Sequence, residues 1–139
     1  MSVLDASPHR FVLLIEDNDD DVMLTRRALA KVDPGAELVV AGDGLTALDI
    51  CFGDSRFSRG KRVPFLILLD LKIPKLKGLE VLQCFRSEAR TQHVPIVILS
   101  ASKEEIDLIE SKDLGANAYI AKPIDPSKLA EVMERVKAG

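Results

Sequence analysis

Cysteine is scarce in this chain of 139 residues, and its scarcity excludes several kinds of site. Cys51 and Cys84 are the only two, and they lie far apart, without the paired spacing used for zinc binding or redox chemistry. Both stand among apolar residues with helical spacing. This pattern indicates reduced thiols in or near the core of a cytoplasmic protein.

A long apolar run is missing as well. The first ten residues hold a single arginine, and the short run Phe11–Ile15 ends in acidic residues, so the sequence fits neither a signal peptide nor a membrane span. Nineteen Lys and Arg residues against 22 Asp and Glu residues give a formal net charge of −3. This balance argues against a surface that follows nucleic-acid phosphates. We therefore expect a cytoplasmic protein that binds neither nucleic acid nor membrane.

What remains is the composition of a folded domain. An apolar content of 47% with 29% charged residues is ordinary for a soluble globular protein. A chain of this length buries roughly 68% of its unfolded surface, enough for a core without disulfides or structural metal. No internal repeat or low-complexity tract is visible, so one domain is expected.

Five short apolar runs alternate with five segments of helical spacing, which is the pattern of βαβ units around a parallel sheet. The expected strands are Phe11–Ile15, Glu37–Ala41, Phe65–Leu69, Val94–Leu99 and Ala118–Ala121. Turn residues at Asp33-Pro34-Gly35, Gly42-Asp43-Gly44 and Asp125-Pro126 separate the segments. The sequence predicts an α/β fold with a doubly wound (βα)5 parallel five-stranded sheet.

Polar residues follow the apolar runs where a ligand of such a sheet would bind. Glu16-Asp17 follow the first run and Asp70 the third, whereas Ser100 follows the fourth and Lys122 the fifth. Because ligands bind outside the carboxyl ends of the strands, folding is expected to gather these groups at one edge.

Three carboxylates in one pocket need compensation, because two like charges ~4 Å apart repel by about 4 kcal/mol at an effective dielectric constant of 20. Lys122 offsets one charge, and a divalent cation would cancel the other two. Oxygen ligands alone favour Mg²⁺, which binds one or two carboxylates together with phosphate oxygens. The pattern therefore predicts a site for Mg²⁺ and a phosphoryl group.

Each of these residues also has a structural interpretation. The run Glu16–Asp21 is typical of a solvated helix start with Asn18 as N-cap, and we assign its last three aspartates to that role. Taken alone, Lys122 is typical of a surface turn and Ser100 of a helix cap. Their joint placement with Asp70 favours a functional site.

The complete set of motifs, in order, resembles the receiver domain of two-component response regulators. The residues that carry the resemblance are Glu16-Asp17, Asp70-Leu-Lys-Ile-Pro74 with Gly78, Ser100-Ala101, Tyr119 and Lys122-Pro123. The resemblance covers essentially the whole chain and implies a single receiver domain over residues 1–139 with no output domain. The length and the extended loop Gly53–Pro64 are also similar to stand-alone regulators that partner bacterial phytochromes.

The resemblance implies a role for each site residue. Asp70 would be the phosphoacceptor and attack the phosphohistidine of a sensor histidine kinase. Asp17, Asp70 and the backbone carbonyl of Lys72 would bind Mg²⁺ directly, with Glu16 acting through water. Lys122 would bind a phosphoryl oxygen. The chain would not be an enzyme, but a phosphoacceptor that catalyses its own phosphorylation and dephosphorylation.

The switch residues follow from the same resemblance. Ser100 would donate a hydrogen bond to a second phosphoryl oxygen, and Tyr119 would be the rotamer switch coupled to it. A half-buried strand aromatic is the structural alternative for Tyr119. Gly78 would allow the turn before the third helix, and the Lys122-Pro123 bond would be cis.

Two further surfaces are expected to meet partners. The basic loop Gly53–Pro64 is most simply a solvated loop, but its cations could dock on an acidic kinase surface. Leu108 lies off the apolar stripe of the fourth helical segment, which favours either a homodimer through the fourth helix, fifth strand and fifth helix, or burial under a loop.

Other functions remain as alternatives. A phosphorelay intermediate would pass the phosphoryl group to a histidine phosphotransfer protein. A haloacid-dehalogenase-like phosphatase would need Asp-x-Asp-x-Thr after the first strand, where this chain reads Glu16-Asp17-Asn18-Asp19-Asp20. A flavodoxin-like FMN binder would need a glycine- and hydroxyl-rich loop at the same place. We therefore expect a response regulator that signals by phosphorylation-dependent protein–protein interaction.

Overall fold

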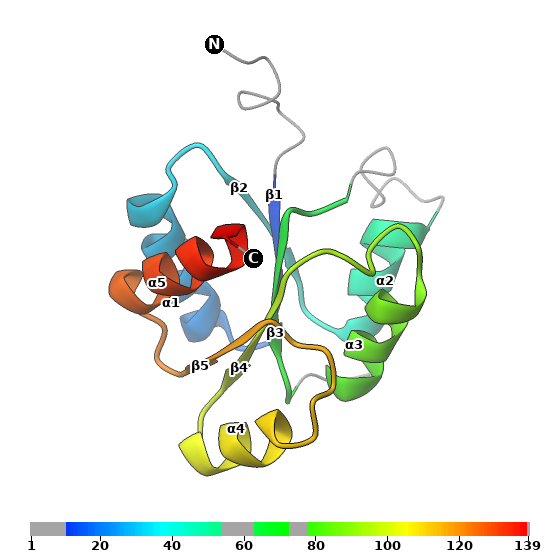
Figure 1. The fold of residues 1–139 in the computed structure, drawn as a ribbon. Helices are drawn as coiled ribbons and strands as arrows, with labels where there is room; N and C mark the ends of the chain where they lie inside the picture. The colour runs from blue at the N-terminus through cyan, green and yellow to red at the C-terminus, as the bar shows by residue number, and fades with distance from the viewer. Residues whose placement is uncertain (1–10, 54–62, 73–77, 139) are drawn as a thin grey trace.

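The computed structural model describes residues 11–53, 63–72 and 78–138, which form a parallel sheet between two layers of helices (Figure 1). The strands are β1 (Phe11–Ile15), β2 (Glu37–Ala41), β3 (Leu66–Asp70), β4 (Ile96–Ser100) and β5 (Ala118–Ala121). The helices are α1 (Asp19–Val32), α2 (Gly44–Phe52), α3 (Gly78–Ser87), α4 (Lys103–Glu110) and α5 (Pro126–Ala138). The strand order is β2-β1-β3-β4-β5, and every pair of neighbours is parallel. The predicted (βα)5 fold is confirmed.

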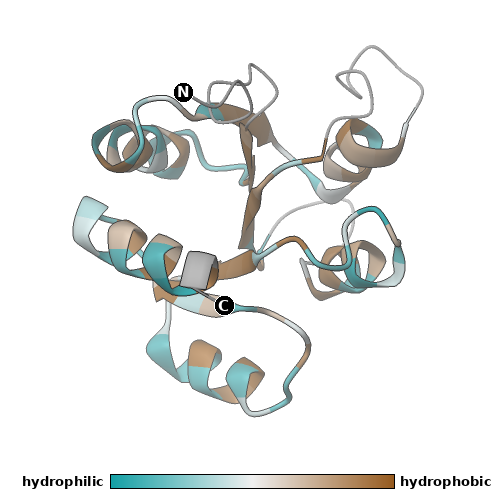
Figure 2. Ribbon diagram, turned by 45° about the horizontal axis from the view of Figure 1, so that its top comes forward, coloured by the Kyte–Doolittle hydropathy of each residue, from teal (hydrophilic) through white to brown (hydrophobic). Residues whose placement is uncertain are grey.

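Alternate residues of each central strand point to opposite faces of the sheet. Leu13 and Ile15 pack with helices α2, α3 and α4, whereas Val12 and Leu14 pack with α1 and α5. All five residues of β1, β3 and β4 are buried, as expected for strands covered on both faces. Figure 2 shows the consequence, with apolar strands inside and polar helix faces outside.

Two strands differ from their predicted bounds. β3 and β4 each extend to the polar residue that follows the apolar run, so that Asp70 pairs with Leu99 and Ser100 with Ala121. Backbone pairing ignores the polarity of the side chain, whereas the prediction used apolar residues alone. β4 also begins two residues later than predicted, after Pro95, which has no N–H to donate to the ladder.

Three of the described helices begin at residues that the sequence marks as an N-cap or a turn. At the start of α1, Asn18 Oδ1 accepts a hydrogen bond from the N–H of Asp21 at 3.0 Å. In the same way, Asp43 Oδ1 accepts the N–H of Thr46 at 2.7 Å at the start of α2. At the start of α5, Asp125 Oδ1 accepts the N–H of Lys128 at 2.9 Å. Since α1, α2, α4 and α5 each follow a strand, their first turns all lie at the carboxyl edge of the sheet. This edge is therefore lined by helix N-termini as well as strand ends.

Glycine at position 78 is required by a close approach of two segments. A Cβ atom on Gly78 would lie 2.8 Å from the Cα atom of Leu71 and 3.2 Å from the carbonyl oxygen of Asp70. The start of α3 therefore packs directly on the backbone that leaves β3. The Lys122-Pro123 peptide bond is cis, as the family resemblance implies.

Several other expectations concern the surface and the thiols. Cys51 is buried, Cys84 is partly buried, and both are free. Of the helices described, none is both long and apolar enough to cross a membrane. The basic residues of the loop Gly53–Pro64 lie outside the described residues.

Candidate functional site

Three carboxylates meet at the carboxyl edge of the sheet. Glu16 and Asp17 directly follow β1, and Asp70 is the last residue of β3. Each offers an oxygen that lies within 4.8 Å of the others. Glu16 and Asp70 are buried, whereas Asp17 is exposed. The structure thus brings together the three acids that the strand ends predict to be neighbours.

The ammonium group of Lys122 lies among carboxylates. Its Nζ atom is 2.8 Å from Oε1 of Glu16, 2.9 Å from Oδ2 of Asp70 and 3.0 Å from Oδ2 of Asp21. Burial alone would lower the pKa of Lys122, but its hydrogen bonds to the three acids outweigh burial and raise the pKa above its ordinary value. Lys122 is therefore a fixed positive charge beside Asp70.

The assignment of Asp21 to a solvated helix start is wrong. Asp19 and Asp20 are exposed, but Asp21 is partly buried and forms an ion pair with Lys122. The reason is geometric: α1 begins at the carboxyl edge, and the third residue of its first turn lies beside the end of β5. Asp21 is a member of the site that the sequence analysis missed, because the contact joins residues 101 positions apart.

The pKa values of the neighbouring carboxyl groups of Glu16 and Asp70 move in opposite directions. Burial and the hydrogen bond to Asp70 raise the pKa of Glu16 to about 7, against the lowering effect of Lys122. Burial alone would raise the pKa of Asp70. Hydrogen bonds from Glu16, the Lys72 N–H and Lys122 outweigh burial and lower this pKa below its ordinary value. Asp70 is therefore the carboxylate that stays ionised.

Both oxygens of Asp70 are held in place. The backbone N–H of Lys72 donates to Oδ1 at 3.0 Å, and the Lys122 ammonium donates to Oδ2 at 2.9 Å. The Lys72 side chain is exposed at the rim. A buried, ionised and immobilised carboxylate is suited to act as a nucleophile.

Ser100 faces helix α4. Its Oγ donates to the carboxylate of Glu105 and accepts the N–H of Ser102 at 3.2 Å. In the part of the chain that the structure describes, no hydrogen bond joins Ser100 to Asp70. The sequence analysis missed Glu105, although the pattern Ser102-x-x-Glu105 is a recognisable capping signal.

Tyr119 is half-buried on β5 and packs with the core under α2, α3 and α4. Burial of the Tyr119 phenol raises its pKa. The nearby carboxylates of Glu110 and Asp113 act in the same direction, with a smaller effect. This position agrees with both interpretations, a switch residue and a half-buried strand aromatic.

The acidic site fits a hard divalent cation. The grouped ligand atoms are carboxylate oxygens, the donors that Mg²⁺ prefers. Oε1 of Glu16 is buried, and the Lys122 ammonium, 2.8 Å away, is also shared with Asp70 and Asp21. Several carboxylates that share one ammonium keep an excess of negative charge, which a cation would stabilise.

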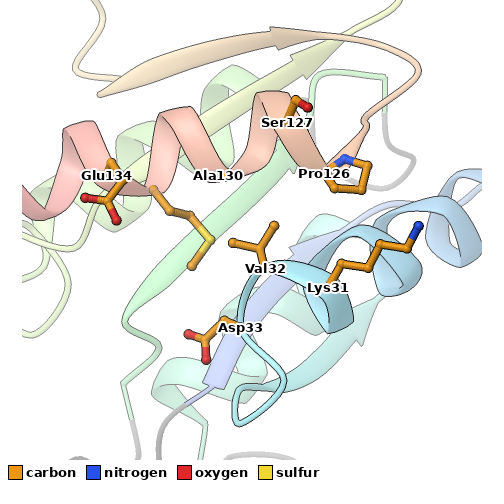
Figure 3. Close-up of a pocket in the computed structure, with 8 residues that line it drawn as sticks. Lys31, Val32, Asp33, Pro126, Ser127, Ala130 and Glu134 are labelled. Carbon is orange, nitrogen blue, oxygen red and sulfur yellow. The ribbon is translucent and has the colours of Figure 1, made fainter.

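A separate hollow lies elsewhere and contains none of these residues. It occupies about 530 Å³ between the end of α1 and helix α5, as Figure 3 shows. Its lining includes Lys31, Val32 and Asp33 on one side and Pro126, Ala130 and Glu134 on the other. The chemistry of the strand ends is therefore separate from the hollow.

The parallel α/β fold carries an acidic site paired with a lysine at its carboxyl edge, and comparison with known proteins identifies its family. Residues 12–134 match the response regulator receiver domain. The chain belongs to this family.

Individual relatives extend over nearly the whole chain. This chain is 32% identical over 135 residues to the probable methanogenesis regulatory protein FilR2 of Methanothrix harundinacea. The match covers 97% of this chain and 86% of that protein. The chain is 31% identical to response regulator Rcp1 of Synechocystis sp., covering 96% and 90%.

Solved structures of other regulators share this fold. The bacteriophytochrome response regulator AtBRR has a TM-score of 0.83 at 39% identity, with 94% of each chain covered. The phosphorylated cyanobacterial phytochrome response regulator RcpA has a TM-score of 0.73 at 37% identity, covering 94% of this chain and 90% of that one. The Mn²⁺-bound form of Rcp1 has a TM-score of 0.70 at 31% identity, covering 92% and 91%.

Proposed function

We propose that this chain accepts a phosphoryl group on Asp70 from a sensor histidine kinase in a Mg²⁺-dependent reaction. The observation that carries the proposal is the Asp70 carboxylate itself, buried at a strand end, 2.9 Å from the Lys122 ammonium and grouped with two further carboxylates. The phosphorylated form then signals by altered contacts with other proteins.

Asp70 is the nucleophile. An oxygen of its carboxylate forms a bond to phosphorus while the bond from phosphorus to the imidazole nitrogen of the donor breaks, and the imidazole leaves with the electron pair. Lys122 offsets negative charge on the phosphoryl oxygens. The N–H of Lys72 fixes the carboxylate orientation, so that the attacking oxygen is aimed before the donor arrives.

The cation site supports this reaction. Mg²⁺ would be held by Asp17, Asp70 and the Lys72 carbonyl, with Glu16 behind them, and supplies positive charge against the phosphoryl oxygens when bound. Binding of a cation to related regulators is supported by the Mn²⁺-bound form of Rcp1.

The donor is proposed to be a phytochrome-type sensor histidine kinase in the cytoplasm. Support comes from the likeness of this chain to response regulators of bacterial and cyanobacterial phytochromes. In this role the chain is a phosphoacceptor and not an enzyme with a separate substrate.

The proposal is tested by incubating the chain with acetyl phosphate and Mg²⁺ and measuring its intact mass. The wild-type chain should gain the mass of one phosphoryl group, and Asp70→Asn should show no such gain. Asp20→Asn is the matched control, because it removes an exposed carboxylate outside the site. An undiminished gain in Asp70→Asn would contradict the proposal.

A further inference from the structure

The hydroxyl of Ser100 lies inside the N-terminal cap of helix α4. Ser102 is the N-cap residue, and its Oγ accepts the N–H of Glu105 at 3.1 Å. In an ordinary capping box the glutamate side chain returns to the N–H of the N-cap residue. Here that N–H donates to Ser100 Oγ instead, and the Ser100 hydroxyl donates to the Glu105 carboxylate.

Ser100 therefore stands between the two partners of the capping box, Ser102 and Glu105. Its single hydroxyl proton is used in the hydrogen bond to Glu105. A hydroxyl group has one hydrogen to donate. The role that the family resemblance implies for Ser100 in the phosphorylated protein needs the same hydrogen for a phosphoryl oxygen. The two hydrogen bonds exclude each other.

We propose that Glu105 is a positioning residue that holds Ser100 on helix α4 and competes with the aspartyl phosphate for its hydroxyl proton. This inference rests on the proposed function of Asp70. When Ser100 turns to the phosphoryl group, the Ser102 N–H and the Glu105 carboxylate lose their shared partner.

The neighbouring acid shows why the role belongs to Glu105. Glu104 accepts a hydrogen bond from Ser102 Oγ at 2.9 Å, is exposed, and has no described contact with Ser100. Glu105 is partly buried and lines a cleft of about 550 Å³ together with Lys72, Gly78 and Ile109. This cleft adjoins the segment that follows Asp70, so Glu105 links the phosphoacceptor edge to the first turn of α4.

The test measures the affinity for beryllofluoride with Mg²⁺, a phosphoryl analogue that binds the aspartate without forming a lasting covalent bond. Binding is followed by the amide signals of Ser102 and Lys72 in NMR titrations. Glu105→Ala should bind beryllofluoride about tenfold more tightly than the wild type, since loss of a hydrogen bond to a charged group is worth at least that factor. Glu105→Gln, which keeps the side-chain shape, should show a smaller gain in the same direction.

Two controls separate this role from a purely structural one. Glu104→Gln should bind the analogue as the wild type does. In a Ser100→Ala background, Glu105→Ala should bring no gain, because there is no hydroxyl proton to release.

The outcomes distinguish the inference from the proposed function. If the wild type binds the analogue and Glu105→Ala binds it no more tightly, or if the gain persists without the Ser100 hydroxyl, the inference is overturned while the phosphoacceptor assignment stands. If the wild type neither binds the analogue nor gains a phosphoryl group from acetyl phosphate, the proposed function fails and the inference fails with it.

Discussion

The carboxylate of Asp21 in the first turn of α1 lies 3.0 Å from the ammonium of Lys122, which follows β5. Lys122 consequently has three acidic partners, of which Asp70 is one. A phosphoryl group that arrives at Asp70 must share Lys122 with Asp21. The site therefore holds one more carboxylate, that of Asp21, than the residues at the strand ends supply.

Neutralising Asp21 should speed phosphorylation by small anionic donors. Asp21→Asn removes one negative charge beside the approach to Asp70, and we expect an acetyl phosphate reaction about threefold faster at saturating Mg²⁺, with a weaker dependence on salt. Asp20→Asn changes the same charge on an exposed side chain and should have a smaller effect. An Asp21→Asn rate equal to that of Asp20→Asn, or slower than wild type, would contradict this electrostatic role.

Replacing Gly78 should destabilise the fold. The added Cβ of Gly78→Ala would meet the Leu71 backbone at 2.8 Å, and strain of this kind costs about 1–3 kcal/mol of unfolding free energy. Urea denaturation measures the loss. Gly42→Ala is the matched control, because a Cβ there meets nothing within 4 Å. Equal stabilities of the two variants would show that the turn after β3 relaxes freely.

The thiol of Cys51 should be unreactive in the folded chain. Burial raises its pKa to about 12, against a small opposing effect of Arg90, so the thiolate is scarce at neutral pH. In Cys84→Ser, iodoacetamide should modify Cys51 only when denaturant is added. Rapid modification of native Cys84→Ser at pH 8 would contradict the burial of this side chain.

The raised pKa of Cys51 also makes the unfolding free energy depend on pH. The folded pKa of Cys51 lies above its ordinary value of about 9, so its contribution to stability is complete below pH 9. That contribution is lost as the pH rises from about 9 toward 12, because the unfolded thiol ionises first. Cys51→Ala should show a weaker decline of unfolding free energy over this range than the wild type.

The exposed Leu108 tests the proposed contact between copies. Its side chain is 60% exposed on α4, so the alternative of burial within its own chain is wrong. If α4, β5 and α5 form a homodimer face in the phosphorylated state, Leu108→Glu should weaken self-association measured by sedimentation in beryllofluoride and Mg²⁺. Leu45→Glu, at an exposed leucine on α2, is the control. A wild-type chain that stays monomeric under these conditions would exclude the dimer.

The sequence predicts the fold and most of the acidic edge for a simple reason. Apolar runs of strand length locate the sheet, and the polar residue that ends each run must lie at its carboxyl edge. For this reason the amino-acid pattern alone is enough to place Asp70, Ser100 and Lys122 together. The bounds of β3 and β4 are harder to predict, because hydropathy reports burial and not backbone pairing.

The residues that the sequence does not reveal depend on side-chain direction. Whether Asp21 faces solvent or Lys122 is set by the rotation of α1 against β5, which no local pattern records. Glu105 carries a local capping signal, but the insertion of Ser100 into that cap depends on how β4 meets α4. Contacts between elements, rather than the elements themselves, are beyond the reach of sequence patterns.

The central claim, that Asp70 alone carries the phosphoryl group, is tested most directly by locating the modification. The chain is phosphorylated by acetyl phosphate with Mg²⁺ and reduced with borohydride, which converts an aspartyl phosphate to homoserine, and its peptides are then sequenced by mass spectrometry. The account predicts homoserine at position 70 and unmodified acids at Glu16, Asp17 and Asp21. Homoserine at Asp17 or Asp21, or a reduced side chain at Glu16, with Asp70 intact would contradict it.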